Sequence, residues 1–404
     1  METYIKRGVH MKDIVIIANF SRDFSETDNG RFMYLCKELS SDNRVEIITS
    51  DFIHGKNKHE EPLKTKWPFK ITFLHEAGYK KNISVQRFLS HRAWGKEVEK
   101  YLLNRDKPDV VYCAVPSLTA SLAAAKYCES NNIRFVIDIQ DLWPEAFKMI
   151  FNIPVLSDIL FAPFKKRANE IYSRADAICG VSRTYVDRAL KVNKKCSDGQ
   201  VVFLGTFLRT FDDGAKGPPV VKKNTNDVWL GYCGTLSASY DIPCVIEAIS
   251  HIKDQKAPVL VIIGSGPREQ EFKELAAKMG VKTIFTGRLP YDKMCAQLKQ
   301  CDIVVNPIVK GSAASIINKH GDYAASGLPV LNTQESQEYR DLVDTYHMGF
   351  NCKNGDAEDL MTKLVLLIND AKLRKEMGEH SRKCAEEKFD RKTSYRAIIN
   401  TILA

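Results

Sequence analysis

The sequence lacks several patterns that would assign a protein to a class at once. Its eleven cysteines are scattered singly and form no Cys-x-x-Cys pair, so neither a disulfide framework nor a cysteine zinc site is expected. No run of about 18 apolar residues occurs, and the first ten residues have no apolar core, so we expect no transmembrane helix and no signal peptide. We therefore expect buried thiols in a reducing cytoplasm.

Composition and charge indicate an ordinary two-domain protein. Apolar residues make up 44% and charged residues 27% of 404 residues, which predicts two domains of about 200 residues. Residues 1–205 hold 32 Lys+Arg against 25 Asp+Glu, whereas residues 206–404 hold 27 against 25. The basic first half suits anionic lipid or phosphorylated substrates, or is a solvated surface. Aromatic residues are not interleaved with the basic ones, so no nucleic-acid partner is expected.

Buried strands alternate with helices along both halves of the chain. The first half has expected strands at 13–20, 45–50, 70–76, 109–115, 134–140 and 177–182. The alternation predicts α/β architecture with two Rossmann-like, doubly wound parallel-sheet domains facing a central cleft. We place these domains at 11–205 and 228–389. The Gly/Pro/Lys-rich segment 206–227 is expected to be a linker, and 390–404 a C-terminal helix.

Small-residue turns follow two strands of the second half. They contribute Gly234 and Thr235 after one strand, and Gly264, Ser265 and Gly266 after the next. Parallel strands deliver such turns to one sheet edge, where backbone amides suit a diphosphate. The second turn is not a dinucleotide fingerprint, because Glu269 stands where a third glycine is required. Tight turns without a ligand are the alternative.

Charged residues follow the same edge further along the chain. Lys319 and Asp322 lie three apart at the start of an expected helix, so they share a face, and Ser315 and Ile316 just precede it with unpaired amides. A lysine at the positive end of a helix suits a diphosphate. Arg288, beside Leu289 in a Gly-Arg-Leu-Pro loop, is placed to bind phosphate bidentately. An intrahelical ion pair, and pairing of Arg288 with Asp292, remain alternatives.

These segments resemble the GT-B fold glycosyltransferases of family 4, the retaining sugar transferases. The resemblance is carried by GYCGTLSASYDIPCVIEAI (231–249), by ADAICGVS (175–182) and by the second-half stretch over 259–332; DLWPE (141–145) resembles the branch that assembles bacterial surface polysaccharides. It implies a retaining transfer from a nucleoside-diphosphate sugar, a UDP-sugar being favoured, to a lipid-linked saccharide at the cytoplasmic membrane face. The context would be capsule, O-antigen or exopolysaccharide biosynthesis.

The resemblance also assigns roles to residues. It implies an N-terminal acceptor domain, a C-terminal donor domain, and a last helix that crosses back onto the first. Lys319 and Arg288 would bind the diphosphate, Asp322 the ribose, and the loop at Leu289 the base. The sequence departs from the family where Ala314 replaces the first of two usual glutamates. Because Asp-x-Asp is absent, we expect no metal and no cofactor, with the leaving group stabilised electrostatically.

On the acceptor side, polar residues cluster at the ends of the first-half strands. Asn19 and Gly30 border the first turn, and Gln140 and Asp141 follow the strand at 134–140. Asp141 either orients or deprotonates the acceptor hydroxyl, or it caps the helix expected to begin at Trp143-Pro144.

The segment 146–167 is apolar, aromatic and followed by a basic cluster. We expect it to contact the membrane, through the residues Phe151, Leu160, Phe161, Lys165, Lys166 and Arg167. The basic helix at 81–100, with Phe88 and Trp94, favours the same interpretation. The alternative is an inter-helix packing surface.

Two other functions compete with transfer. A nucleotide-sugar epimerase or hydrolase on the same fold would consume donor without acceptor. A catalytically weak accessory partner of another glycosyltransferase is suggested by Ala314 and Gln140, which replace usual site residues.

Overall fold

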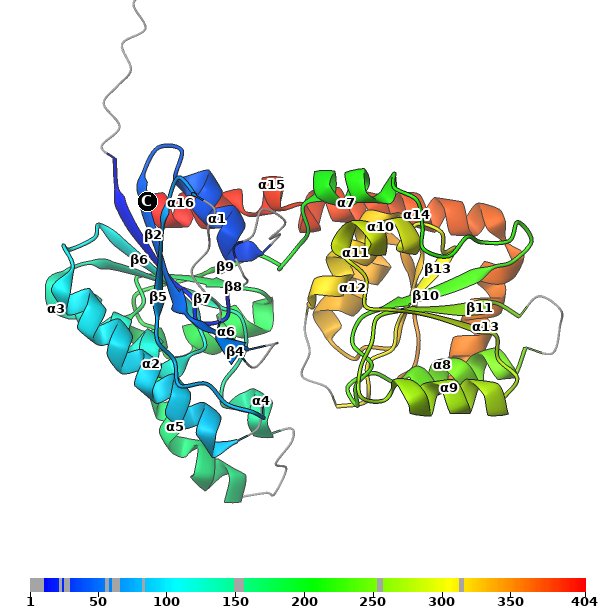
Figure 1. The fold of residues 1–404 in the computed structure, drawn as a ribbon, viewed down its shortest axis with the longest axis horizontal. Helices are drawn as coiled ribbons and strands as arrows, with labels where there is room; N and C mark the ends of the chain where they lie inside the picture. The colour runs from blue at the N-terminus through cyan, green and yellow to red at the C-terminus, as the bar shows by residue number, and fades with distance from the viewer. Residues whose placement is uncertain are drawn as a thin grey trace, which may run out of the picture. The chain divides into compact units, whose positions relative to one another are not determined.

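The computed structural model describes residues 11–21, 24, 30–54, 58–59, 66–81, 84–148, 156–252, 257–311 and 316–404. These residues divide into two compact units (Figure 1). Unit 1 runs to Val202 and also includes Tyr395–Ala404, and unit 2 is Phe203–Ser394.

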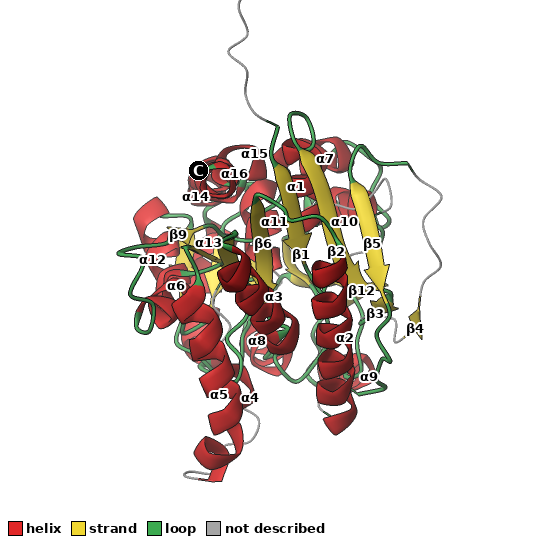
Figure 2. Ribbon diagram, turned by 90° about the vertical axis from the view of Figure 1, so that its left-hand side faces the viewer, coloured by secondary structure: helices red, strands yellow, loops and turns green. Residues whose placement is uncertain are grey.

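Unit 1 is built on a parallel seven-stranded sheet (Figures 1 and 2). Its strands, in spatial order, are β5 (Lys70–Leu74), β2 (Arg44–Ser50), β1 (Asp13–Ile17), β6 (Val110–Val115), β7 (Arg134–Ile139), β8 (Ala177–Gly180) and β9 (Gln200–Val201). Its helices are α1 (Arg31–Leu39), α2 (Val85–Asn104), α3 (Leu118–Asn131), α4 (Glu145–Lys148), α5 (Leu156–Arg174), α6 (Arg183–Leu190) and α16 (Arg396–Leu403). A small antiparallel pair, β3 (Phe52–Ile53) and β4 (Lys58–His59), follows β2.

Unit 2 repeats the architecture with a parallel six-stranded sheet. In spatial order its strands are β12 (Thr283–Gly287), β11 (Val259–Ile263), β10 (Trp229–Cys233), β13 (Ile303–Asn306), β14 (Val330–Asn332) and β15 (Gly349–Asn351). The helices are α7 (Leu208–Ala215), α8 (Ile242–Ser250), α9 (Glu269–Lys278), α10 (Tyr291–Leu298), α11 (Asn318–Ser326), α12 (Gln337–Tyr346), α13 (Ala357–Asn369), α14 (Ala371–Cys384), the π-helical η1 (Ala385–Phe389) and α15 (Arg391–Ser394).

Both sheets are covered on two faces, and this explains their apolar strands. In unit 1, α1 and α16 pack on one face, while α2, α3 and α5 cover the other (Figure 2). In unit 2, α8, α9 and α13 share one core with the sheet, and α7, α10, α11 and α14 lie on the opposite side (Figure 1). Because each central strand is buried on both faces, its sequence is a continuous apolar run. The two parallel sheets confirm the predicted α/β fold with two Rossmann-like domains.

Two expectations about connections are wrong. The segment 206–227 is not a plain linker, because it contains α7, whose Leu208 and Phe211 are buried against α10 in unit 2. The segment 390–404 forms two short helices and not one: α15 belongs to unit 2, and α16 belongs to unit 1, the domain to which the chain was expected to return. The chain passes from one unit to the other between Ser394 and Tyr395.

Candidate functional site

Three turns meet at the carboxyl edge of the unit 2 sheet. The N–H of Gly234 donates to the carbonyl of Ile263 (3.0 Å), and Gly264 forms a bridge with Gly287 at the end of β12. Gly264 has φ +155°, and a Cβ there would lie 1.9 Å from the carbonyl oxygen of Gly234. The neighbouring turn therefore sterically excludes a side chain at position 264. Packing thus requires this glycine, in addition to the ligand-binding role expected from the sequence.

Lys319 is the most unusual group at this edge. Its residue is 8% exposed, and its Nζ has no hydrogen-bond partner among the described residues. The ammonium lies 4.3 Å from the ring centre of Tyr232 and 3.8 Å from that of Tyr240, and a Cβ on Gly234 would approach it to 2.9 Å. Burial lowers the pKa of Lys319 to about 7. Aromatic faces stabilise a cation but do not neutralise it, so this amine is placed to receive an anion.

Asp322 lies one turn further along α11 and is held by a short chain of hydroxyls. The Tyr291 hydroxyl donates to its Oδ1 (2.7 Å), and the same hydroxyl contacts the Thr206 hydroxyl (2.7 Å). No ion pair joins Lys319 to Asp322 within the described chain, so the structure does not support the intrahelical pair that the sequence left open. The Tyr291 hydroxyl, a neutral donor, thus helps to orient the carboxylate.

The remaining donor-side residues differ in their surroundings. Arg288 is exposed, and no ion pair with Asp292 occurs within the described residues. Leu289 packs half-buried on the unit 2 core, and Ile316 is buried just before α11. Thr235 and Ser265 accept hydrogen bonds through their carbonyls, from Tyr232 Oη (2.7 Å) and Leu236 N (3.1 Å), and a Cβ on Gly266 would lie 2.3 Å from the Leu236 carbonyl. Ala314 and Ser315 lie outside the described residues.

In unit 1 the end of β7 carries a buried ion pair. Asp138 is fully buried and accepts two hydrogen bonds from Arg31, at 2.8 Å from Nε and 2.9 Å from Nη2. Although burial opposes charge, Asp138 holds the pKa of Arg31 above its usual value. The Gln140 amide also donates to Asp138 (2.6 Å), and Gly30 precedes α1, the helix that carries Arg31. Gln140 therefore supports this pair.

Asp141 is held by its own neighbours. Its Oδ1 accepts from the Leu142 N–H (2.9 Å) and its Oδ2 from the Trp143 Nε1–H (3.1 Å). The structure does not support the capping alternative, because α4 begins only at Glu145 and Asp141 accepts from Leu142 and Trp143, which precede that helix. Burial raises the pKa of Asp141, while its hydrogen bonds with Trp143 and Leu142 oppose that rise. A carboxylate with a raised pKa, on the strand edge of unit 1, is suited to proton exchange.

A polar and aromatic cluster lies on the same edge of unit 1, and of its members only Asn19 was predicted from the sequence as an acceptor-side residue. Buried Glu76 accepts from the Asn19 amide (2.9 Å) and from the Ser90 hydroxyl (2.8 Å). The Arg87 guanidinium lies over the Trp143 ring (4.7 Å) and donates to His91 Nε2 (3.3 Å). Burial, followed by the charge of Arg87, lowers the pKa of His91 to about 3, so this imidazole is neutral at physiological pH.

Within this cluster, the sequence alone could have linked only residues that lie close together in the chain. Arg87 and His91 lie four apart in the helix that the sequence marked as basic, and a spacing of four places two side chains on one face.

The residues expected at a membrane fall into two groups. Phe161 is 5% exposed and packs against Phe164, and Trp94 is fully buried; both were wrongly expected at the surface, because a stripe of apolar side chains here meets neighbouring helices. Leu160 is 60% exposed, and Lys165 and Lys166 are exposed beside it.

Two further residues, Arg167 and Phe151, belong to the predicted membrane-contact set. Arg167 lies over the Phe164 ring (5.9 Å), and Phe151 lies outside the described residues. Within the described chain, none of the helices combines the length and apolar character that crossing a membrane requires.

Comparison with known sequences supports one family. Residues 216–384 match the family model described as glycosyl transferases group 1. The chain is 22% identical over 227 residues to an uncharacterized glycosyltransferase of Methanocaldococcus jannaschii. That alignment covers 55% of this chain and 57% of the relative, so the chain spans little more than half the length of the curated relative it matches.

Solved structures extend the similarity over almost the whole chain. The Anabaena protein HepE, solved with UDP and glucose, superposes with a TM-score of 0.67 at 14% identity, covering 96% of this chain and 99% of HepE. WaaG, described as a glycosyltransferase involved in lipopolysaccharide biosynthesis, gives 0.64 at 15% identity, with 96% and 99% covered. Identities this low show the fold, and that fold is GT-B, two Rossmann-like α/β domains.

Proposed function

We propose that the chain is a retaining, metal-independent glycosyltransferase of family 4, which moves a sugar from a nucleoside-diphosphate sugar to a lipid-linked saccharide. A UDP-sugar is the favoured donor. The observation that carries the proposal is Lys319, a buried amine without a hydrogen-bond partner in the described chain, at the start of α11. A buried cation of this kind is costly unless an anion pairs with it, and a diphosphate supplies that anion.

The chemistry assigns one task to each donor-side group. Lys319 and the helix amides stabilise the negative charge that develops on the leaving diphosphate, together with Arg288 from the exposed loop after β12. Asp322, oriented by Tyr291, accepts from the ribose hydroxyls. HepE was solved with UDP and glucose, which favours the same donor class for the similar fold here.

The acceptor is assigned to unit 1. Asp141, with its raised pKa, orients the acceptor hydroxyl, and the departing phosphate takes part in accepting its proton. Asp141 thus acts on the acceptor and is not its only base.

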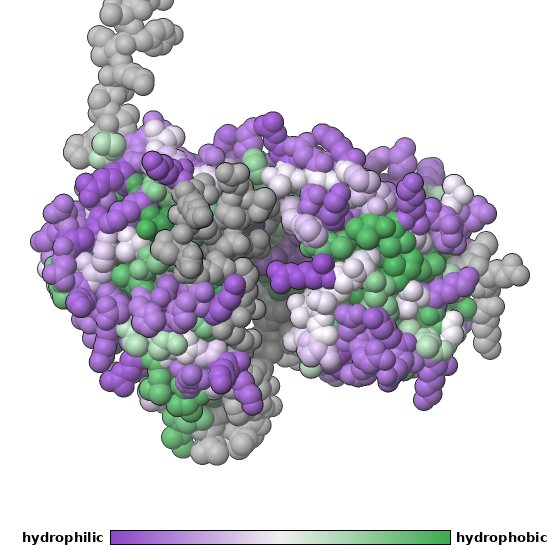
Figure 3. All heavy atoms as spheres, in the orientation of Figure 1, coloured by the Kyte–Doolittle hydropathy of each residue, from purple (hydrophilic) through white to green (hydrophobic). Residues whose placement is uncertain are grey.

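We further propose a peripheral position at the cytoplasmic face of the membrane, in surface polysaccharide assembly. Phe88 of α2 contacts Phe164 of α5 (ring centres 5.0 Å apart), so the first turn of α2 lies beside the middle of α5. Both expose apolar side chains, Leu89 on α2 and Leu160 on α5, and apolar surface is visible at the lower end of unit 1 in Figure 3. The exposed Lys165 suits anionic headgroups. The involvement of WaaG in lipopolysaccharide biosynthesis is consistent with this context.

The test is turnover of radiolabelled UDP-sugars by purified protein with membrane-extracted acceptor, with and without EDTA. Lys319→Ala is expected to lower turnover on the order of a hundredfold, the effect of removing one preorganised charge. Lys299→Ala is the matched control, since its amine is already bonded to the Ser326 carbonyl (2.7 Å).

Three outcomes would contradict the proposal. Near-wild-type turnover in Lys319→Ala would remove its main support. Donor consumption without acceptor would indicate an epimerase or hydrolase, and failure to bind any nucleotide would favour an accessory protein.

A further inference from the structure

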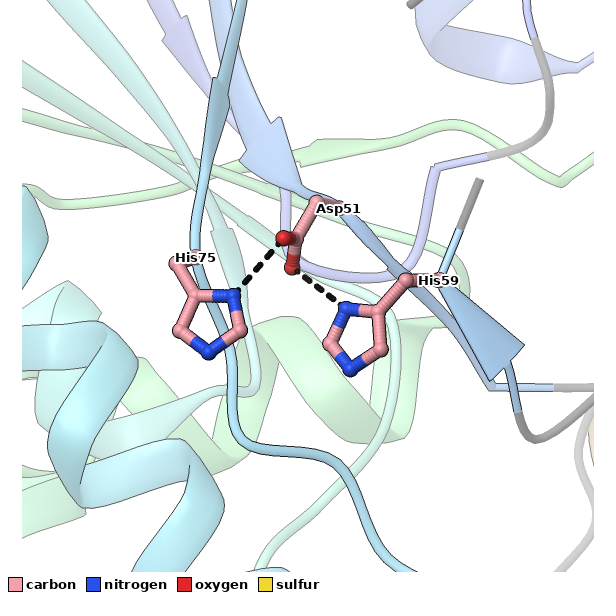
Figure 4. A group of neighbouring side chains, drawn as sticks. All are labelled: Asp51, His59 and His75. Carbon is pink, nitrogen blue, oxygen red and sulfur yellow. Dashed lines mark hydrogen bonds and ion pairs between the residues drawn. The ribbon is translucent and has the colours of Figure 1, made fainter. Parts of the chain in front are cut away.

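Three metal-ligating side chains converge at one corner of unit 1. Asp51 directly follows β2, His75 directly follows β5, and His59 lies on β4 (Figure 4). The Nδ1 of His75 lies 2.9 Å from Asp51 Oδ2, and the Nδ1 of His59 lies 3.2 Å from Asp51 Oδ1. The two imidazole rings are stacked with centres 5.1 Å apart and an interplanar angle of 19°. One carboxylate therefore bridges two imidazoles, one on β4 and one just after β5.

The backbone holds this group in place. The N–H of Asp51 donates to the Leu74 carbonyl (3.1 Å), and Asp51 Oδ1 accepts from the N–H of Glu76 (2.9 Å). On the other side, the ring of Phe52 packs edge-on against His59 with centres 5.5 Å apart. Because β2 and β5 are paired in parallel register, their backbones place Asp51 and His75 side by side, independently of any contact between the two side chains. Preorganisation of this kind lowers the cost of gathering ligands around an ion.

The spacing of the ligand atoms is close to that around a tetrahedral ion. One atom from each of the three residues lies within 4.8 Å of the others. Zinc bonds of about 2.0–2.1 Å place neighbouring ligand atoms about 3.3 Å apart in a tetrahedron. Each histidine Nδ1 already lies about that far from one oxygen of Asp51, His59 from Oδ1 (3.2 Å) and His75 from Oδ2 (2.9 Å). Binding one ion requires the imidazoles and the carboxylate to shift within that 4.8 Å range. Both histidine side chains are exposed, so an ion can enter from solvent.

We propose that Asp51, His59 and His75 form a Zn²⁺ site, with water as the fourth ligand. Two imidazoles and one carboxylate are a ligand set that zinc and other late first-row divalent ions prefer over Mg²⁺ or Ca²⁺. The site lies in unit 1, so it is separate from the metal-independent donor site proposed in unit 2. It does not rest on the proposed transfer reaction.

Bound zinc would fix the β3–β4 pair to the end of β5. Glu76 follows His75 directly, and its carboxylate holds Asn19 and Ser90. The ion therefore orders the segment from which Glu76 reaches the acceptor-side edge, which is a structural role.

The experiment is a Zn²⁺ titration of chelator-treated, full-length protein by calorimetry, with Co²⁺ absorption as a second readout. The expected result is one ion per chain with a dissociation constant of about 1 μM or lower, and visible Co²⁺ bands typical of a tetrahedral site. His75→Ala should weaken binding at least tenfold and abolish the bands, since only two ligands remain. His75 is exposed, so this variant is expected to fold.

His380→Ala is the matched control. It removes a histidine from another surface pair, His347 and His380, whose ring centres are 6.4 Å apart and which share no carboxylate in the described chain. This variant should bind zinc as the unmodified protein does. Equal zinc affinity in His75→Ala and in the unmodified protein would overturn the proposal, as would the absence of stoichiometric binding. Thermal stabilisation by a nucleotide should persist in His75→Ala, which separates failure of this site from failure of the donor site.

Discussion

Both units place charged groups at the same edge of similar sheets, but these groups have charged or polar partners in unit 1, whereas Lys319 in unit 2 has no anionic partner in the described chain. In unit 1, Asp138 is matched by Arg31 and Gln140, and Glu76 by Asn19 and Ser90. In unit 2, Lys319 is buried between two tyrosine rings without an anionic partner in the described chain. Charges of the first kind hold the fold together, whereas a charge of the second kind gains an anionic partner only when a ligand arrives.

The largest effect is expected from breaking a matched pair. Asp138→Ala leaves the Arg31 guanidinium buried without its carboxylate, which should lower the free energy of unfolding by roughly 3–5 kcal/mol. Urea denaturation measures the change, and Asp138→Asn keeps the shape of the side chain. Asp198→Ala, which breaks the exposed pair with Arg183, should remain close to the unmodified protein. A loss for Asp138→Ala of under about 1 kcal/mol would show that the pair is not structural.

A smaller effect is expected from the unmatched charge, as a dependence of donor binding on pH. The pKa of Lys319 is about 7 in the free site, below the ordinary lysine value of 10.5, and a bound diphosphate should raise it. Binding then takes up a proton. Affinity for UDP-glucose should be constant below about pH 7 and fall by up to tenfold per unit as the pH rises above it.

Calorimetry in buffers of different ionisation enthalpy measures both the affinity and the proton uptake. Lys319→Met should bind weakly and with no such pH dependence between about pH 7 and pH 8.5. Equal slopes in the two proteins would assign the titration to another group.

The smallest effect concerns charge on the exposed surface of unit 1. Lys165→Gln should weaken binding to anionic lipid vesicles about fivefold, since one lysine near such a surface contributes about 1 kcal/mol. Vesicle sedimentation at two salt concentrations provides the measurement. Lys107→Gln, at an exposed position beyond the end of α2, is the control. Loss of binding equal in both variants would indicate only a general effect of net charge.

The sequence predicts the sheets well because their strands are buried on both faces. The strands β2, β6 and β7 begin and end within one residue of the predicted ranges, since apolar runs bounded by polar residues leave little freedom. The same reasoning failed over 206–227, where glycines and lysines concealed Leu208 and Phe211 at helical spacing. A short amphipathic helix has too few apolar positions to stand out in such a composition.

The candidate site was predictable where its residues follow one motif and not where distant segments meet. Lys319 and Asp322 lie on one helix, so their shared face follows from spacing. The partners of Glu76 come from β1 and α2, and His59 reaches Asp51 only because a small strand pair follows β2. The predicted membrane contact of Phe161 failed for a related reason. Apolar side chains at a surface and in a packed helix have the same sequence signature, and Phe161 is buried.

The return of the chain at Tyr395 has a consequence for biosynthesis. Tyr395, Ile398 and Ile402 are fully buried in the core of unit 1, beside strands formed from the first half of the chain. On the ribosome, the first two hundred residues emerge long before these three side chains exist. Unit 1 cannot close its core until residue 402 has been translated, whereas unit 2 is complete at Ser394. Unit 1 is therefore synthesised first but completed last. A nascent chain stalled near residue 390 would leave an apolar face of unit 1 open to chaperones.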